Sequence, residues 1–249
     1  MSDVLPGAEA WAADGGSTGV LVVHGFTGSP GSMRGVAEAA AAAGHTVELP
    51  RLPGHGTSLD DMLTTGWADW SAAAEAAFTD LAARVEKVIV LGLSMGGSLT
   101  LWLGTRHPEI AGLVCVNPAV VPLDDATLGQ MAEIADGGTP VLPGVGSDIA
   151  KEGEVEIAYD GMPVRPLLSM QAGLAEFHAG LGDVDIPLLL CTSPEDHVVP
   201  PSDSDHLASV WSGEVERVTL ENSFHVATQD NDQGLIIERT LAFIERVTS

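Results

Sequence analysis

The chain has 249 residues, 45% of them hydrophobic, and carries 35 Asp and Glu against 10 Lys and Arg, a formal net charge of -25. This acidic balance argues against nucleic acid or an anionic membrane surface as partner, because phosphate groups are held mainly by Lys and Arg. No stretch approaches the roughly 18 unbroken apolar residues that a membrane span needs. We expect one globular domain over residues 1–249, cytoplasmic because the N-terminus has no signal-peptide pattern.

Six mostly apolar runs predict the strands of a parallel sheet, since strands covered on both faces lose the alternation of apolar and polar residues. These runs are residues 18–24, 45–50, 87–93, 112–117, 187–192 and 215–220. Helical patterns lie between them at residues 31–43, 68–85, 97–107, 202–211 and 232–247. This alternation predicts an open, doubly wound α/β fold, in which ligands bind at the carboxyl ends of the strands.

Residues 118–170 interrupt this alternation. Pro and Gly punctuate weakly periodic segments there, and no strong strand run appears. An insertion of this size at the carboxyl end of a strand predicts a small cap over the site. Elsewhere, Trp67 and Trp70 are interpreted as core rather than pocket residues, because aromatic pairs at helical spacing are more often buried.

The two cysteines, Cys115 and Cys191, each lie inside an apolar strand-like run. Buried free cysteines behave as small hydrophobic residues. Neither belongs to a Cys-x-x-Cys or Cys/His spacing of the kind that binds metal. We therefore expect two reduced core thiols, no metal and no organic cofactor.

The pentapeptide Gly92-Leu93-Ser94-Met95-Gly96 connects a strand run to a helical run. A sharp strand-to-helix turn lifts the serine Oγ clear of the backbone, and glycines on both sides let the chain close that tightly. The N-terminus of the following helix offers free N–H groups and a positive dipole end to a developing oxyanion. Ser94 is therefore predicted to be a nucleophile.

A serine nucleophile needs a base, and a carboxylate that orients the base, in the chain order Ser, acid, His. Asp196 follows the strand run 187–192 and is preferred as the acid over Glu195, because it adjoins the turn at 198–201 and because of the resemblance given below. His225 follows the last strand run and is the predicted base, since an imidazole can take and return a proton near neutral pH. His197 is its competitor.

The first strand run ends in His24-Gly25-Phe26-Thr27-Gly28. A glycine-flanked turn at that place can point one backbone N–H at the reacting centre. The N–H groups of Phe26 and Met95 are therefore predicted to form a two-donor oxyanion hole.

These motifs together resemble those of the bacterial monoacylglycerol lipases and related small carboxylesterases of the α/β-hydrolase fold. Two further segments contribute to the resemblance, Pro53-Gly54-His55-Gly56 and Ser223-Phe224-His225-Val226-Ala227-Thr228. The resemblance covers nearly the whole chain and implies a triad of Ser94, Asp196 and His225. Residues 154–159 also look like the stretch that contributes a glutamate contact to glycerol in those lipases, and Glu156 is the matching position.

The expected function is a serine ester hydrolase that cleaves monoacylglycerols to fatty acid and glycerol through an acyl-enzyme. Its partner would be a small neutral lipid ester; the oligomeric state is left open. Three alternatives remain at this point: a broad carboxylesterase for short acyl esters, a perhydrolase, and a small-molecule receptor with negligible turnover, because a fold does not fix a function.

Overall fold

A computed structural model describes residues 2–144 and 146–249; positions 1 and 145, the latter within the predicted cap, lie outside the described residues. The main sheet of the described residues has the strand order β1-β3-β2-β4-β5-β8-β9. Only β1 runs antiparallel to its neighbour. The strands are β1 (Trp11–Ala13), β2 (Thr18–Val23), β3 (Thr46–Leu49), β4 (Lys87–Leu93), β5 (Gly112–Val116), β8 (Leu188–Thr192) and β9 (Val215–Thr219).

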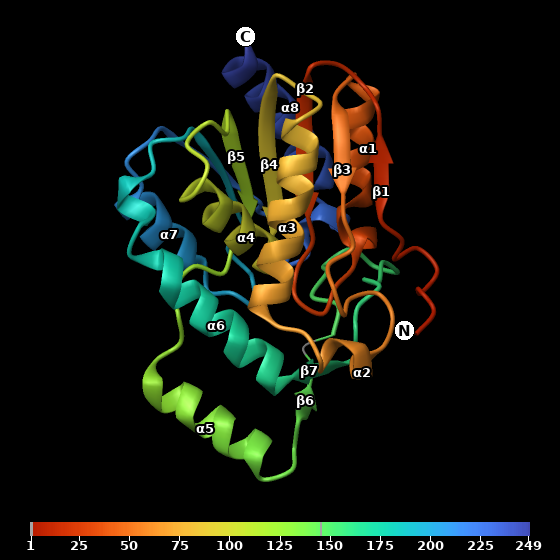
Figure 1. The fold of residues 1–249 in the computed structure, drawn as a ribbon, viewed down its shortest axis with the longest axis vertical. Coiled ribbons are helices and arrows are strands. Elements are labelled where there is room, and N and C mark those ends of the chain that lie inside the picture. Colours follow the sequence, from red (N-terminus) through yellow and green to blue (C-terminus); the bar gives the residue numbers. More distant parts are fainter. Residues whose placement is uncertain (1, 145) are drawn as a thin grey trace.

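Helices cover both faces of this sheet (Figure 1). One face packs against α1 (Arg34–Ala42) and α8 (Gln233–Thr248). The other packs against α3 (Trp67–Ala82), α4 (Met95–Gly104), α6 (Val164–His178) and α7 (Pro201–Val210). The predicted α/β fold with a mostly parallel, helix-flanked sheet is confirmed. The short edge strand β1 was not predicted, because three residues are too few to show a period.

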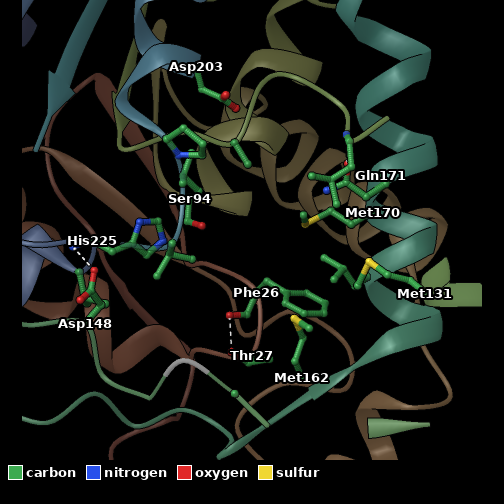
Figure 2. A pocket seen from close by; sticks show the side chains of 18 of the residues that line it. Phe26, Thr27, Ser94, Met131, Asp148, Met162, Met170, Gln171, Asp203 and His225 are labelled. Carbon is green, nitrogen blue, oxygen red and sulfur yellow. Dashed lines mark hydrogen bonds between the residues drawn. The ribbon is translucent and has the colours of Figure 1, made fainter. Parts of the chain in front are cut away.

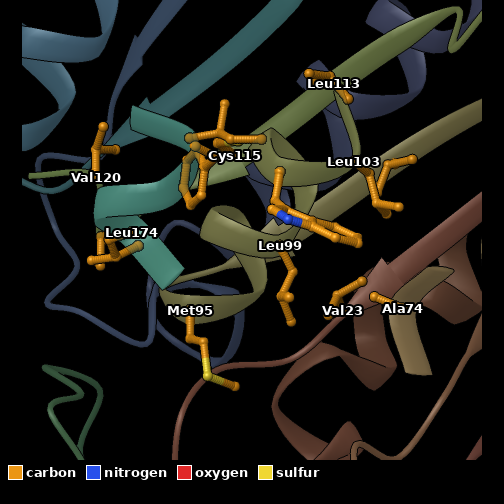
Figure 3. Packing of buried hydrophobic residues seen from close by; sticks show 14 of the residues in the cluster. Val23, Ala74, Met95, Leu99, Leu103, Leu113, Cys115, Val120 and Leu174 are labelled. Atoms are coloured by element: carbon orange, nitrogen blue, oxygen red, sulfur yellow. The ribbon is translucent and has the colours of Figure 1, made fainter. Parts of the chain in front are cut away.

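Side chains of the central strands alternate between two apolar clusters, one on each face of the sheet. In β4, Val88 and Val90 belong to the cluster under α3 and α4, whereas Ile89 and Leu91 belong to the cluster under α1 and α8. Because successive strand residues point to opposite faces, two covered faces require an unbroken apolar run. Figure 3 shows the first cluster, in which α4 side chains meet strand residues such as Cys115.

The residues that were expected to be core are buried. Trp67 and Trp70 both lie in the cluster under α3. Cys115 and Cys191 are free and buried. Burial raises the pKa of the Cys115 thiol, and it raises that of Cys191 to about 12, so both stay protonated at neutral pH.

The segment between β5 and β8 contains α5 (Asp125–Asp136), a small hairpin and α6. The hairpin pairs β6 (Val141–Pro143) with β7 (Gly161–Pro163). No described residue of α5 is buried, whereas Leu174 and Phe177 in the second half of α6 belong to the core. The predicted end of the cap at residue 170 therefore falls inside a helix. Pro166 lies in the first turn of α6, where proline is tolerated.

Two short helical segments lie before α3 in the chain. They are α2 (Leu59–Met62), which Ser58 caps through its hydroxyl, and a 3₁₀ turn, η1 (Pro30–Met33), before α1. Two more 3₁₀ turns are η2 (Leu181–Asp183) and η3 (Ala227–Gln229). Among the helices that the structure describes, none has the length and apolar character needed to span a membrane. The parallel strands β2, β4, β5, β8 and β9 place their carboxyl ends along one edge of the sheet, where the 118–170 segment begins.

Candidate active site

Ser94 lies on the turn between β4 and α4 with φ 55° and ψ -119°. A positive φ is uncommon for a residue with a side chain, and such strain concentrates at functional sites. A Cβ at Gly92 would collide with the backbone carbonyl of Gly96, and one at Gly96 would collide with the carbonyl of Val23. The turn can therefore close only with glycine at both positions, and it presents Ser94 to a pocket.

This pocket has a volume of about 610 Å³, and both Ser94 and His225 line it (Figure 2). Much of its wall is apolar and comes from the 118–170 segment, α6 and the loop after β8. The apolar lining residues include Val121, Leu123, Met131, Met162, Leu167, Met170, Val198 and Val199. A few polar side chains, among them Asp148 and Glu156, face the same space. An apolar cavity with a few convergent polar groups is typical of a small-molecule site.

His225 and Asp196 form a buried pair at the ends of β9 and β8. His225 Nδ1 lies 2.7 Å from Asp196 Oδ2. The other oxygen of Asp196 accepts hydrogen bonds from the backbone N–H groups of Val198 and Val199, each at 2.8 Å. Both carboxylate oxygens are thus engaged, which fixes the orientation of the carboxylate and of the imidazole ring that it contacts.

The two alternatives, Glu195 for the acid and His197 for the base, take no part in the Asp196–His225 contact. Glu195 is exposed, and His197 pairs through Nδ1 with Asp148 rather than with Asp196. No hydrogen bond joins Ser94 Oγ to His225 Nε2 in this structure, although both side chains line one pocket. A hydrogen bond between a serine nucleophile and its base often forms only when substrate binds.

Asn117, at the end of β5, contributes to this geometry and was not predicted from the sequence. It has a positive φ of 44°. Its Oδ1 accepts the backbone N–H of Ser193 at 2.8 Å, and its Nδ2 donates to the backbone carbonyl of His225 at 2.8 Å. Asn117 therefore connects the loop after β8 to the loop after β9. The sequence contained it only as the last residue of an apolar run.

The two predicted oxyanion donors lie next to Ser94. Met95 follows Ser94 directly and is buried. Gly25, just before Phe26, packs so closely that a Cβ on it would lie 3.3 Å from Ser94 Cβ. Neither Phe26 N–H nor Met95 N–H donates a hydrogen bond to any part of the chain that the structure describes. Backbone N–H groups inside proteins are nearly always paired, so these two are available to a ligand.

His24 holds the peptide unit that carries the Phe26 N–H. Its Nε2 accepts the backbone N–H of Leu52 at 3.1 Å, so Nδ1 carries the proton and donates to the carbonyl of Gly25 at 3.0 Å. In a trans peptide the C=O and N–H point in opposite directions, so this bond directs the Phe26 N–H away from His24. Burial lowers the pKa of His24 to about 4, and the ring therefore stays neutral at physiological pH.

We expect His24 to make the protein sensitive to acid. An unfolded histidine titrates near pH 6.5, whereas folded His24 titrates near 4, so the unfolded state binds more protons between these values. The free energy of unfolding should therefore fall as the pH drops from about 6.5 to about 4, with a contribution of about 3 kcal/mol from this group. Urea denaturation at several pH values measures this free energy of unfolding. In His24→Asn the free energy of unfolding should depend less on pH over this range. An equally steep dependence in the variant would show that His24 is not the group responsible.

Comparison with known proteins agrees with this architecture. The profile of the alpha/beta hydrolase family matches residues 20–236, and the chain belongs to that family. It is 45% identical to the thermostable monoacylglycerol lipase of Bacillus sp. (strain H-257), over 98% of this chain and 96% of the relative. A carboxylesterase of Bacillus subtilis (strain 168) is 24% identical over 94% of each chain.

A solved structure points the same way. This structure was described with LipS and LipT, two metagenome-derived lipolytic enzymes, and its sequence is 44% identical to this chain. It superposes with a TM-score of 0.93 and covers 98% of this chain and 100% of its own. At this identity and coverage, the similarity extends over the sheet, the site and the 118–170 segment.

Proposed function

We propose that the chain is a serine ester hydrolase that cleaves monoacylglycerols to fatty acid and glycerol, with Ser94, Asp196 and His225 as its triad. The observation that carries this proposal is the buried Asp196–His225 pair, whose imidazole shares one pocket with Ser94 on its strained turn. The 45% identical monoacylglycerol lipase supports the choice of substrate.

In the proposed reaction, Ser94 Oγ attacks the ester carbonyl while His225 Nε2 takes the hydroxyl proton. The N–H groups of Phe26 and Met95 receive the negative charge that develops on the carbonyl oxygen. His225 then gives its proton to the glycerol oxygen as the bond to the acyl carbon breaks. A water then gives a proton to His225 and attacks the acyl carbon, and His225 returns the proton to Ser94 Oγ as the acyl–oxygen bond breaks, which releases the fatty acid and restores Ser94.

We assign residues 118–170 the role of a cap that shields the acyl chain. Helix α5 has no buried described residue, yet its Met131 faces the cavity. Leu123, Met162 and Met170 add to the same apolar wall. A wall of this kind suits a long hydrocarbon chain, because burying each methylene contributes about 0.8 kcal/mol.

Glu156 is the proposed glycerol contact. It lines the pocket with Ser94 and His225, and its Oε1 lies so close to Gly28 that any side chain there would displace it. Burial raises the pKa of Glu156, an effect that the nearby His225 and the Ser32 hydroxyl partly offset. A carboxylate kept in this setting is placed to accept hydrogen bonds from the two free hydroxyls that distinguish a monoacylglycerol from a simple ester.

We expect Glu156→Ala to lower kcat/KM for a monoacylglycerol by about 10- to 100-fold, because hydrogen bonds to a charged group contribute roughly 1.5–3 kcal/mol each. The ethyl ester of the same fatty acid has no such hydroxyls, so its kcat/KM should change little. The two substrates are measured on the same enzyme preparation. Parallel losses on both would remove the support for glycerol recognition.

The proposed function itself is tested by a panel of mono-, di- and triacylglycerols and p-nitrophenyl esters at several chain lengths. Multiple turnover with a preference for monoacylglycerols is the expected result. A preference for short simple esters would favour the carboxylesterase alternative, for which the Bacillus subtilis relative is the supporting observation. Binding without turnover would identify a receptor.

A further inference from the structure

Asp148 lies in the 118–170 segment, yet its carboxylate contacts both loops that carry the acid and the base. Its Oδ2 accepts the backbone N–H groups of His225 and His197, each at 3.1 Å. Its Oδ1 lies 2.8 Å from His197 Nδ1. His197 directly follows Asp196, so one carboxylate spans the two loops at the end of the sheet. The bond to His225 is drawn in Figure 2.

Further bonds hold the same stretch of chain against the His225 loop. The carbonyl of Asp148 accepts the N–H of Val226 at 3.0 Å. Asp230, beyond the base, accepts the N–H of Ala150 at 2.7 Å and that of Lys151 at 2.9 Å. Residues 148–151 are therefore fixed to the loop after β9, which carries His225, by hydrogen bonds that Asp148 and Asp230 accept. Of these two carboxylates, Asp148 is the one that also bonds to the loop after β8, which carries Asp196.

We propose that Asp148 is a positioning residue for the triad: its carboxylate sets the separation of the Asp196 and His225 loops and so aims His225 Nε2 at Ser94. The inference rests on the proposed function. The Asp148 side chain is only 10% exposed. A carboxylate that accepts backbone N–H bonds with little water nearby holds them firmly, because these bonds are charge-assisted and weakly screened.

The placement of Asp148 makes the catalytic geometry depend on the cap. The same segment carries Glu156 into the pocket. At its far end, Tyr159 donates its backbone N–H to the carbonyl of Thr27, the residue after Phe26, at 3.1 Å. One stretch of chain thus contacts the base loop, the proposed glycerol site and the oxyanion loop. A cap that lost the Asp148 contacts to His225 and His197 would leave the Ser94 turn intact but the base misaligned.

The test compares Asp148→Ala and Asp148→Asn with Glu152→Ala, which removes the same charge from an exposed position four residues away. The substrate is p-nitrophenyl butyrate, which has no glycerol hydroxyls and so bypasses the proposed role of Glu156. Labelling by a fluorophosphonate is measured in parallel, at a temperature where circular dichroism shows every variant to be folded. Wild-type protein that neither turns over nor labels would contradict the proposed function rather than the role of Asp148.

We expect Asp148→Ala to lower kcat and the labelling rate together by about 10- to 100-fold, with KM changed by less than about twofold, because the base is displaced while the pocket remains. Asp148→Asn should recover to within about threefold of wild type, since an amide oxygen still accepts both backbone N–H bonds. Glu152→Ala should match wild type. The role is overturned if Asp148→Ala matches Glu152→Ala, if the loss appears only in KM, or if Asn is as damaging as Ala.

If Asp148→Ala does not fold, Asp148→Glu decides the matter. This variant keeps the charge and both acceptor oxygens but adds one methylene, which changes the separation of the loops. We expect about a tenfold loss in kcat, because small displacements of catalytic groups are costly. A wild-type kcat in Asp148→Glu would overturn the positioning role.

Discussion

Replacing Ser94 with alanine is expected to abolish ester hydrolysis and to prevent covalent labelling by a fluorophosphonate. The acyl-enzyme forms on Ser94 Oγ, and Leu93 and Met95 on either side of it carry no hydroxyl, thiol or amine that could take its place. The loss in kcat should be about 10⁶-fold, the size found when the nucleophile of a serine protease is removed. Because alanine keeps the backbone turn and the glycine contacts, the fold should survive.

Initial rates and the mass of the intact protein after treatment with the probe measure this prediction. Ser98→Ala is the matched control, one turn further along α4. The Ser98 side chain is fully buried, and its hydroxyl donates to the carbonyl of Ala119 at 2.6 Å. Because this hydroxyl cannot reach the probe, its loss should leave labelling intact. A Ser94→Ala protein that still accepts the probe would place the nucleophile at another residue.

The parts of this molecule that the sequence predicted are those with local physical causes. A strand covered on both faces must be apolar along its whole length, and so the run 87–93 identified β4 correctly. The turn after it needs glycine wherever another backbone segment passes too close, and so Gly92 and Gly96 located Ser94 without any knowledge of the neighbouring strands. In both cases the signal lies within a few residues of the feature.

The parts that the sequence did not predict depend on contacts between distant segments. Asp148 is 77 residues from His225, and nothing local distinguishes it from the other acidic residues of a chain that has 35 of them. Asn117 bonds to Ser193 across 76 residues. Such side-chain bonds to backbone groups arise only once the loops are in place, so no periodicity or motif in a single sequence indicates them.

The choice between Glu195 and Asp196 shows the same limit at short range. Both side chains belong to an irregular loop, where neither a helical nor a strand period says which one points inward. In the structure the backbone N–H groups of Val198 and Val199 converge on Asp196, and Glu195 faces solvent. The sequence left two candidates for the acid of the proposed triad, and of these two it is Asp196 that contacts His225 in the structure.

Asp196→Asn is expected to lower kcat by about 10⁴-fold with the fold intact, by analogy with the same change in a serine protease. The expectation follows from the two oxygens of Asp196. One accepts the N–H groups of Val198 and Val199, and in the variant only the amide oxygen can take that place. The amide NH₂ must then face His225 Nδ1, where Asp196 Oδ2 lies in the native protein.

An NH₂ group facing Nδ1 favours the tautomer of His225 that has no proton on Nδ1. The proton then lies on Nε2, and that nitrogen can no longer accept the Ser94 proton. The loop keeps its backbone bonds, so thermal unfolding should change little while kcat collapses. Glu195→Gln is the matched control and should stay within about twofold of wild type, because surface substitutions away from special contacts have small effects. A large loss in Glu195→Gln with a normal rate in Asp196→Asn would mean that Glu195 orients the base, against the 2.7 Å contact on which the proposed triad depends.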